Sequence, residues 1–118
     1  MNHLERCRPW IEAALEYSGG THNYQDIVDG ISSGYMQLWP AERGCLVTEI
    51  TTYPRKKILN VFLGGGELDQ LIEMHDDLSA WGKAQGCDAA TIIGRPGWER
   101  IYKARGWQRQ HVVLAKEL

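Results

Sequence analysis

One continuous stretch of the chain, residues 57–107, limits the possible folds more than any other part. It begins with an apolar run, interrupted only by Asn60, that is typical of a strand covered on both faces: Ile58, Leu59, Val61, Phe62 and Leu63. Gly64, Gly65 and Gly66 follow, and three residues without Cβ predict a sharp turn that leaves backbone N–H groups uncovered. The stretch therefore opens with a central strand and a glycine turn.

A helix and a second strand complete this unit. From Glu67 to about Gln85, apolar residues recur at helical spacing and most charged residues fall on the other side, which predicts a helix that lies on a sheet. Gly86 ends the helix, and the small and branched residues Ala89–Ile93 are typical of another strand. Strand, helix and strand together predict a β-α-β unit whose two strands are parallel.

Two helices and two further strands are predicted ahead of this unit. Pro9 lacks a backbone donor, so the first helix either starts near Arg8 or is kinked there. A second helix is expected over Asn23–Ser32, with the first residue as its cap. The strands are expected at Tyr35–Trp39 and Cys45–Thr52, and the short turn between them predicts antiparallel pairing.

The end of the chain predicts a short helix and a last strand. The helix is expected from Trp98 to about Arg105, with Gly106 as its C-terminal cap. The strand is expected from residue 108 or 109 to Ala115, and its apolar residues are expected to be buried: Val112, Val113 and Leu114. The whole pattern predicts one α/β domain over residues 1–118, in which an antiparallel meander leads into the β-α-β unit and helices cover both faces of a mixed sheet.

Composition argues against several functional classes. The net charge of −2 is unlike that of a general nucleic-acid-binding protein, and no apolar run approaches the roughly 20 residues that span a bilayer. Cys7, Cys45 and Cys87 are odd in number, lack CxxC spacing and follow no signal peptide, so we expect reduced thiols and a cytoplasmic setting. The four histidines show no ligand spacing, so no metal site is expected, and His75 is expected to be packed and hydrogen-bonded.

The order of elements resembles that of the GCN5-related N-acetyltransferase family over nearly the whole chain. The most specific part is the segment 101–107, IYKARGW, which is similar to a late helix of the family where a tyrosine precedes a glycine-aromatic pair. The segment 94–98, GRPGW, resembles a segment of short phage-associated proteins that are distant relatives of that family. The resemblance implies an acetyltransferase-type fold shortened by its first strand and by part of its last hairpin.

The resemblance also implies acetyl-CoA as a cofactor. In the family, the glycine turn and the helix start bind its pyrophosphate through backbone N–H groups, which here are those of Gly64, Gly65, Gly66 and Glu67. Arg95 is a further candidate, because ligands of α/β sheets gather at the C-terminal ends of parallel strands. The carboxylates of Glu67 and Asp69 repel phosphate, so weak or absent binding is expected.

Acyl transfer to an amine needs a base, donors for the oxyanion and an acid that protonates the thiolate. The resemblance implies Tyr102 as the acid, although an amphipathic core tyrosine would explain that residue equally well. Glu49 is the best candidate base, and an exposed or paired strand carboxylate is the alternative. The leading interpretation is an acyl-CoA-dependent N-acyltransferase, or a CoA-binding relative, that acts on a small-molecule or protein amine.

The alternative is a non-catalytic phage or prophage protein that uses the fold for protein interaction in the host cytoplasm, as a virion component or a modulator of a host protein. Fold alone does not choose between the two functions. The Tyr35–Trp39 strand is expected at an edge of the sheet with apolar and aromatic side chains. Such edges tend to be covered, so we expect a homodimer or cover from the N-terminal helices.

Overall fold

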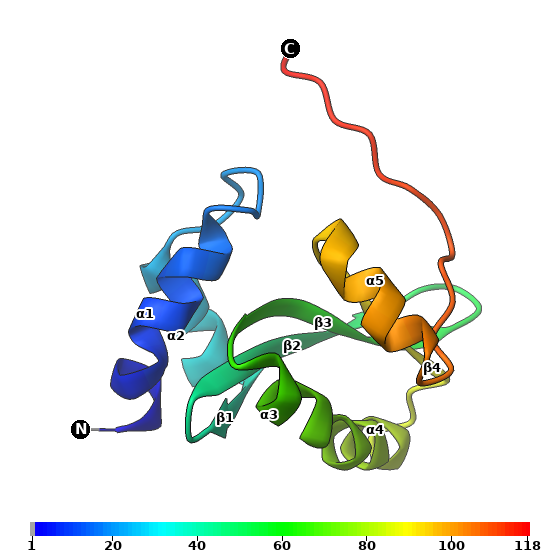
Figure 1. Cartoon of the computed structure of the whole chain (residues 1–118), viewed down its shortest axis with the longest axis horizontal. Coiled ribbons are helices and arrows are strands. Elements are labelled where there is room, and N and C mark those ends of the chain that lie inside the picture. The colour runs from blue at the N-terminus through cyan, green and yellow to red at the C-terminus, as the bar shows by residue number, and fades with distance from the viewer. Residues whose placement is uncertain (1) are drawn as a thin grey trace.

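The computed structural model describes residues 2–118, in which five helices and four strands form a layered α/β arrangement (Figure 1). In chain order they are α1 (His3–Leu15), α2 (Tyr24–Ser32), β1 (Met36–Ala41), β2 (Gly44–Thr52), β3 (Lys57–Gly66), α3 (Leu68–Glu73), α4 (His75–Ala84), β4 (Ala89–Ile92) and α5 (Pro96–Lys103). The strands form one sheet in the order β1-β2-β3-β4.

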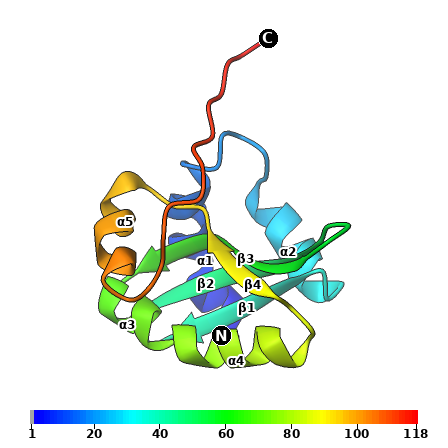
Figure 2. The same ribbon diagram turned by 90° about the vertical axis from the view of Figure 1, so that its right-hand side faces the viewer.

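The sheet has the predicted mixed topology. β1 pairs antiparallel with β2, β2 pairs antiparallel with β3, and β3 pairs parallel with β4. The α/β class, the meander and the β-α-β unit are therefore confirmed. The crossover between the two parallel strands contains α3 and α4, which lie along one side of the sheet (Figure 2).

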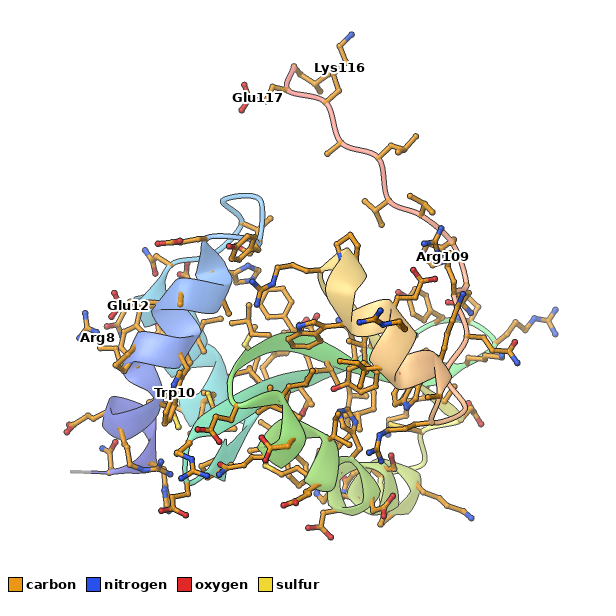
Figure 3. The ribbon with its side chains drawn as sticks, viewed as in Figure 1. Arg8, Trp10, Glu12, Arg109, Lys116 and Glu117 are labelled. Carbon is orange, nitrogen blue, oxygen red and sulfur yellow. The ribbon has the colours of Figure 1, made fainter. Side chains whose placement is uncertain are left out.

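Two apolar cores form on the two faces of the sheet because successive strand residues point to opposite sides. Cys45 and Val47 of β2 pack with Cys7 and Ile11 of α1 and with α2. The intervening residue, Leu46, packs on the other face against α3 and α4, together with Leu59, Val61, Leu71 and Leu78. Figure 3 shows Arg8 and Glu12, an i,i+4 ion pair, on the outer side of α1, away from this packing.

A β-bulge interrupts the alternation in the middle of β3. Val47 pairs with Leu63 and Thr48 pairs with Val61, so Phe62 is an additional residue with no counterpart on β2. As a result, Phe62 and Leu63 both pack on the side of α1 and α2. A bulge bends its strand and increases the local twist, so β3 changes direction here.

The two N-terminal helices are fixed by asparagine caps. The side chain of Asn2 accepts a hydrogen bond from Glu5 N at 2.8 Å, and α1 then continues through Pro9. The predicted start near Arg8 is therefore wrong. The predicted cap of α2 is confirmed: Asn23 Oδ1 accepts from Asp26 N at 2.9 Å, and the Asp26 carboxylate accepts from Asn23 N, which makes a capping box.

The helix predicted from Glu67 to Gln85 is two helices. α3 ends at Glu73 and α4 begins at His75, with Met74 between them at φ −79° and ψ −11°. Met74 N donates to Leu71 O at 3.2 Å, an i→i−3 bond that tightens the last turn of α3. The prediction of one continuous helix is wrong, although the apolar face extends across both helices because Leu71 and Leu78 are buried together.

The predicted last strand does not form. Residues 108–118 lie outside every helix and strand and extend away from the body of the protein (Figure 1). Val112, Val113 and Leu114 are 62%, 76% and 90% exposed, so the prediction that they are buried is wrong. In the described part of the chain, no helix is long and apolar enough to cross a membrane.

Candidate functional site

The two parallel strands separate halfway along β3. β4 is in register with β3 from Ile58 to Val61, and Ile93 N donates to Val61 O at 3.3 Å as the last bond between them. β3 then continues for five residues, to Gly66, and among the described strands these residues pair with β2 alone. The bulge at Phe62 lies at this point, so β3 bends just where β4 leaves it. On the side that β4 has left, the backbone groups of residues 62–65 face no partner strand within residues 2–118.

The glycine triplet belongs to β3 and is not a turn. Gly64, Gly65 and Gly66 pair with Leu46, Cys45 and Gly44 of β2, so the predicted end of the strand at Leu63 is wrong. The physical reason is close packing on both faces of the sheet. A Cβ on Gly64 would lie 2.7 Å from Cη2 of Trp98, and a Cβ on Gly65 would lie 2.8 Å from the carbonyl O of Trp10.

The backbone turns only at the last glycine. Gly66 has φ +101°, a conformation that glycine adopts without strain. The next amide, that of Glu67, donates to Arg43 O at 2.8 Å, so it is already occupied. The Arg43 guanidinium also pairs with the Glu67 carboxylate at 2.9 Å. The predicted repulsion of phosphate by Glu67 is therefore offset by a neighbouring positive charge.

Tyr102 lies in an aromatic cluster between α4 and α5. Its side chain is 4% exposed, and its hydroxyl is 2.7 Å from Nε2 of His75. The Trp107 ring completes the cluster, with centroids 5.6 Å from His75 and 5.7 Å from Tyr102. His75 is 8% exposed, so its predicted packing and hydrogen bonding are confirmed. Its Nδ1 has no hydrogen-bond partner among residues 2–118.

Burial sets the protonation of this pair. It raises the pKa of the Tyr102 hydroxyl to about 12, against a weaker lowering by the Arg105 guanidinium. Burial lowers the pKa of His75, while the nearby Asp76 carboxylate raises it to a lesser extent. At neutral pH the pair is therefore a protonated phenol beside an uncharged imidazole.

A groove of about 990 Å³ runs between α3–α4 and the end of α5, and the Tyr102–His75 pair lies in its wall. Three carboxylates line it from α3 and α4, and one guanidinium lines it from the segment after α5: Asp69, Glu73, Asp76 and Arg105. The remaining lining is Leu68, Ile72, His75, Ser79, Ile101, Tyr102 and Trp107. Within the described residues, no group of His, Cys, Asp and Glu side chains could hold a metal ion.

Glu49 belongs to a polar row that crosses three strands. Its Oε1 accepts from Asn60 Nδ2 at 3.4 Å, and Asn60 Oδ1 accepts from the Thr91 hydroxyl at 2.9 Å. The row follows the register, because Glu49 pairs with Asn60 on β3 and Asn60 pairs with Thr91 on β4. Glu49 is partly buried and points to the face covered by α1 and α2.

Arg95 lies between β4 and α5 and reaches the connection between α1 and α2. Its guanidinium carbon is 4.5 Å from the ring centroid of Tyr17, a cation–π contact between segments far apart in the sequence. Tyr17 is 65% exposed, so this contact is at the surface. It joins the first part of the chain to the segment that follows the parallel strands.

The predicted site residues thus occupy three regions. Gly64 lies against Trp98 of α5, one helical turn before Tyr102, so these two predicted residues are close through that ring. Glu49 lies on the opposite face of the sheet from the Tyr102–His75 pair, and Arg95 contacts Tyr17. Sequence reasoning missed His75 as the partner of Tyr102, because a separation of 27 positions in the sequence leaves no local pattern.

The overall architecture is similar to that of solved acetyltransferase structures. One is a predicted acetyltransferase of Clostridium acetobutylicum with acetyl-CoA, at a TM-score of 0.70 and 10% identity, covering 98% of this chain and 92% of that one. An acetyltransferase of Trypanosoma brucei has a TM-score of 0.65 at 11% identity, covering 93% and 94%. The glucosamine-6-phosphate N-acetyltransferase of Arabidopsis thaliana has a TM-score of 0.64 at 13% identity, covering 98% and 94%.

These similarities concern the fold. No protein-family model matches the chain, and no curated protein matches it. Three structures that share little sequence with the chain align over nearly their whole lengths and over its own. The chain therefore has the fold of the GCN5-related N-acetyltransferases, as its order of elements predicted.

Proposed function

We propose that this protein is a CoA-binding relative of the N-acetyltransferases and transfers an acyl group from acyl-CoA to an amine. The observation that carries the proposal is the separation of β3 from β4 beyond Val61, in a fold similar to that of an acetyltransferase with acetyl-CoA. A β-strand edge without a partner strand binds extended, amide-containing groups through backbone hydrogen bonds. The pantetheine arm of CoA is such a group, so residues 62–65 are the proposed binding edge.

The fit of CoA to this chain is uneven. The β3 edge suits the amides of pantetheine, and the Trp98 ring against Gly64 suits the alkyl part of the pantetheine arm. Trp98 covers Gly64, so a ligand that passes over this glycine displaces the indole or runs beside it. Near the start of α3, Glu67 is paired with Arg43, whereas Asp69 faces the groove with no ion pair among the described residues. The Asp69 carboxylate is therefore the unpaired negative charge near the start of α3 that would repel a bound phosphate.

Tyr102 is the proposed general acid, and His75 decides whether it can act as one. If the neutral imidazole carries its proton on Nε2, it donates to the phenol oxygen and leaves the Tyr102 O–H free to protonate a thiolate. If the proton is on Nδ1, the phenol donates to Nε2 and is no longer available. The first tautomer is the one that supports catalysis, and it gives His75 a positioning role.

Glu49 is the proposed general base for the incoming amine. One of its oxygens accepts from Asn60, which leaves the other available to a water or to an ammonium group. Its position on the face opposite Tyr102 allows the amine and the thiol to lie on the two sides of the sheet opening. A base and an acid on opposite sides of a reacting carbonyl can act in the same transfer.

Calorimetric titration with acetyl-CoA tests the proposal. We expect measurable but weak binding by the wild type and at least about tenfold tighter binding by Asp69→Asn, because a unit charge about 6 Å from a phosphate contributes about 2–3 kcal/mol at an effective dielectric near 20 before screening. Asp77→Asn is the matched control, since it makes the same change on α4 outside the groove lining. Equal affinities in the two variants would place the phosphates elsewhere.

The second candidate is a non-catalytic protein that keeps the fold for interaction, as in a phage or prophage particle or with a host protein. The acidic groove wall favours it, because three carboxylates face one guanidinium there. Absence of acetyl-CoA binding by wild type and Asp69→Asn alike would put this candidate first. The wild type could instead bind acetyl-CoA but acetylate no amine of a panel, with equal acetyl-CoA affinity in Tyr102→Phe and Glu49→Gln. That result would support CoA binding and exclude the proposed acid and base.

A further inference from the structure

The groove between α3–α4 and the end of α5 carries a negative charge that its own lining does not balance. Three carboxylates line it, those of Asp69, Glu73 and Asp76, together with one guanidinium, that of Arg105. None of these four groups forms an ion pair within residues 2–118. With three negative charges against one positive charge, the lining has an excess of two negative charges at neutral pH.

The three carboxylates form a row along the α3–α4 pair. Glu73 follows Asp69 by four positions and Asp76 follows Glu73 by three, the spacing that places side chains on one side of a helix. Like charges at this spacing repel each other and destabilise a helix. The row therefore lowers the stability of the helices that carry it, and a bound positive charge would offset this loss.

A buried hydrogen-bond acceptor without a partner belongs to the same lining. His75 lines the groove, and only 8% of it is exposed. Its Nε2 is 2.7 Å from the Tyr102 hydroxyl, whereas its Nδ1 has no hydrogen-bond partner within residues 2–118. Because burial lowers the pKa of this ring, the imidazole is uncharged at neutral pH, and Nδ1 can accept when the proton is on Nε2. A buried polar atom of this kind indicates a ligand or an ordered water that completes its hydrogen bonding.

The rest of the lining suits an organic cation rather than a metal ion. Leu68, Ile72 and Ile101 supply apolar side chains on which an alkyl chain can pack, and the rings of Tyr102 and Trp107 line the same groove. Ammonium groups bind favourably over aromatic rings. Within the described residues, no group of His, Cys, Asp and Glu side chains could hold a metal ion.

We propose that the groove binds a linear alkyl diamine, whose two ammonium groups balance the excess of two negative charges and whose alkyl chain packs on the apolar lining. One ammonium group lies beside Asp69. The other lies between Glu73 and Asp76 and donates to His75 Nδ1, directly or through one ordered water. Residues four apart on α3 are about 6 Å apart along the helix axis, at about 1.5 Å per residue, a separation that a short diamine can span.

The diamine site is separate from the place proposed for the reacting amine. Glu49 lies on the opposite face of the sheet from the Tyr102–His75 pair, so a cation in the groove is not the amine that this base would serve. Diamine binding therefore requires neither CoA nor acyl transfer. It does affect Tyr102, because a donor at His75 Nδ1 holds the ring proton on Nε2 and leaves the Tyr102 O–H free.

Calorimetric titration of the full chain at low ionic strength tests the site, since salt screens contacts between charges. The probe is the diamine putrescine, and butylamine, with the same carbon chain and one amine, is the matched ligand. We expect putrescine to bind at least about threefold more tightly, because its second ammonium group adds an ion pair.

Two variants locate the bound diamine. Glu73→Gln should weaken putrescine binding by about threefold or more, and the fold should tolerate it, because Glu73 is the last residue of α3, where a negative charge opposes the helix dipole. Asp77→Asn, outside the groove lining, should leave the affinity unchanged. Absence of putrescine binding, equal affinities for the two amines, or equal losses in the two variants would each overturn the proposal.

NMR of the ring nitrogens in an isotope-labelled chain distinguishes the groove from the rest of the acidic surface. The chain has four histidines, and within residues 2–118 only His75 lines the groove. Saturation with putrescine should shift the Nδ1 signal of His75, as expected for a nitrogen that begins to accept a hydrogen bond, and leave the signals of His3, His22 and His111 nearly unchanged. Calorimetric binding without a shift at His75, or with equal shifts at all four rings, would mean that the cation binds elsewhere and that the proposal is wrong.

Discussion

Replacement of Gly64 by alanine tests the inference that the glycine triplet serves close packing in β3. In the structure, a Cβ at this position would lie 2.7 Å from Cη2 of Trp98 and 2.8 Å from Cδ2 of Leu46. Both distances are well below van der Waals contact, and the indole is a rigid ring that must move as a whole. Overpacking of this kind costs about 1–3 kcal/mol in free energy of unfolding.

Gly97→Ala is the matched control, because it makes the same chemical change in a helix with open space around the site. Apart from its chain neighbours and the backbone of its own helix, no heavy atom of residues 2–118 lies within 4 Å of a Cβ built on Gly97. Alanine should therefore stabilise α5 by up to about 1 kcal/mol through its helix propensity and the smaller entropy of the unfolded chain. The two variants should thus move the stability in opposite directions.

Urea unfolding followed by circular dichroism measures both changes at constant m-value. The double variant Gly64→Ala/Trp98→Leu should lose less stability than the sum of its single variants, by about 0.5 kcal/mol or more, because residues in contact couple by about 0.5–3 kcal/mol. If Gly64→Ala unfolds within about 0.5 kcal/mol of wild type, the range of featureless surface changes, then Trp98 does not pack on this strand. The glycines would then need another explanation.

Three further predictions concern ionisation, thiol access and capping. Burial lowers the pKa of His75, so the folded protein should lose stability as the pH falls below the pKa of about 6.5 that histidine has in the unfolded chain. The loss should be at most about 1.4 kcal/mol per pH unit. Urea unfolding at pH 5 and 7 measures it, and His75→Gln should remove it. Native Cys87 should react with a thiol reagent before Cys7 and Cys45, which are buried; equal rates for all three would contradict the packing of α1 on β2. Asn23→Ala should cost about 1 kcal/mol in thermal unfolding and Asn23→Ser much less, and equal losses would argue against the capping box.

The parts of the fold that short-range patterns determine could be predicted from the sequence. The strand after Lys57, the parallel strand at Ala89 and the cap at Asn23 each depend on residues within one element or its flank. The parallel pairing follows from the length of the crossover between the strands. These elements are enough to give the α/β class and the order of the sheet.

The errors arose where distant residues decide the local structure. Three glycines in succession predict a turn, yet Trp98, more than thirty residues later, covers the first of them and favours a continued strand. The apolar segment from Val112 to Leu114 has the composition of a strand, but composition does not specify a partner. The pair of Tyr102 and His75 likewise depends on how α5 is placed against α4. Tertiary packing therefore determined most of what the site contains.

The extra residue in β3 changes how mutations at successive positions of that strand should be tolerated. Before Phe62, odd-numbered positions such as Leu59 and Val61 face α3 and α4; after it, Leu63 faces α1 and α2 instead. In a scan of polar substitutions along β3, the loss of stability at each face should alternate with a period of two residues, and the alternation should shift by one residue at the bulge. Deletion of Phe62 would bring the two phases of the alternation into line and leave Leu63, then directly after Val61, on the side of α1 and α2. The strand can therefore lose this one residue while the side chains before and after it keep their present faces.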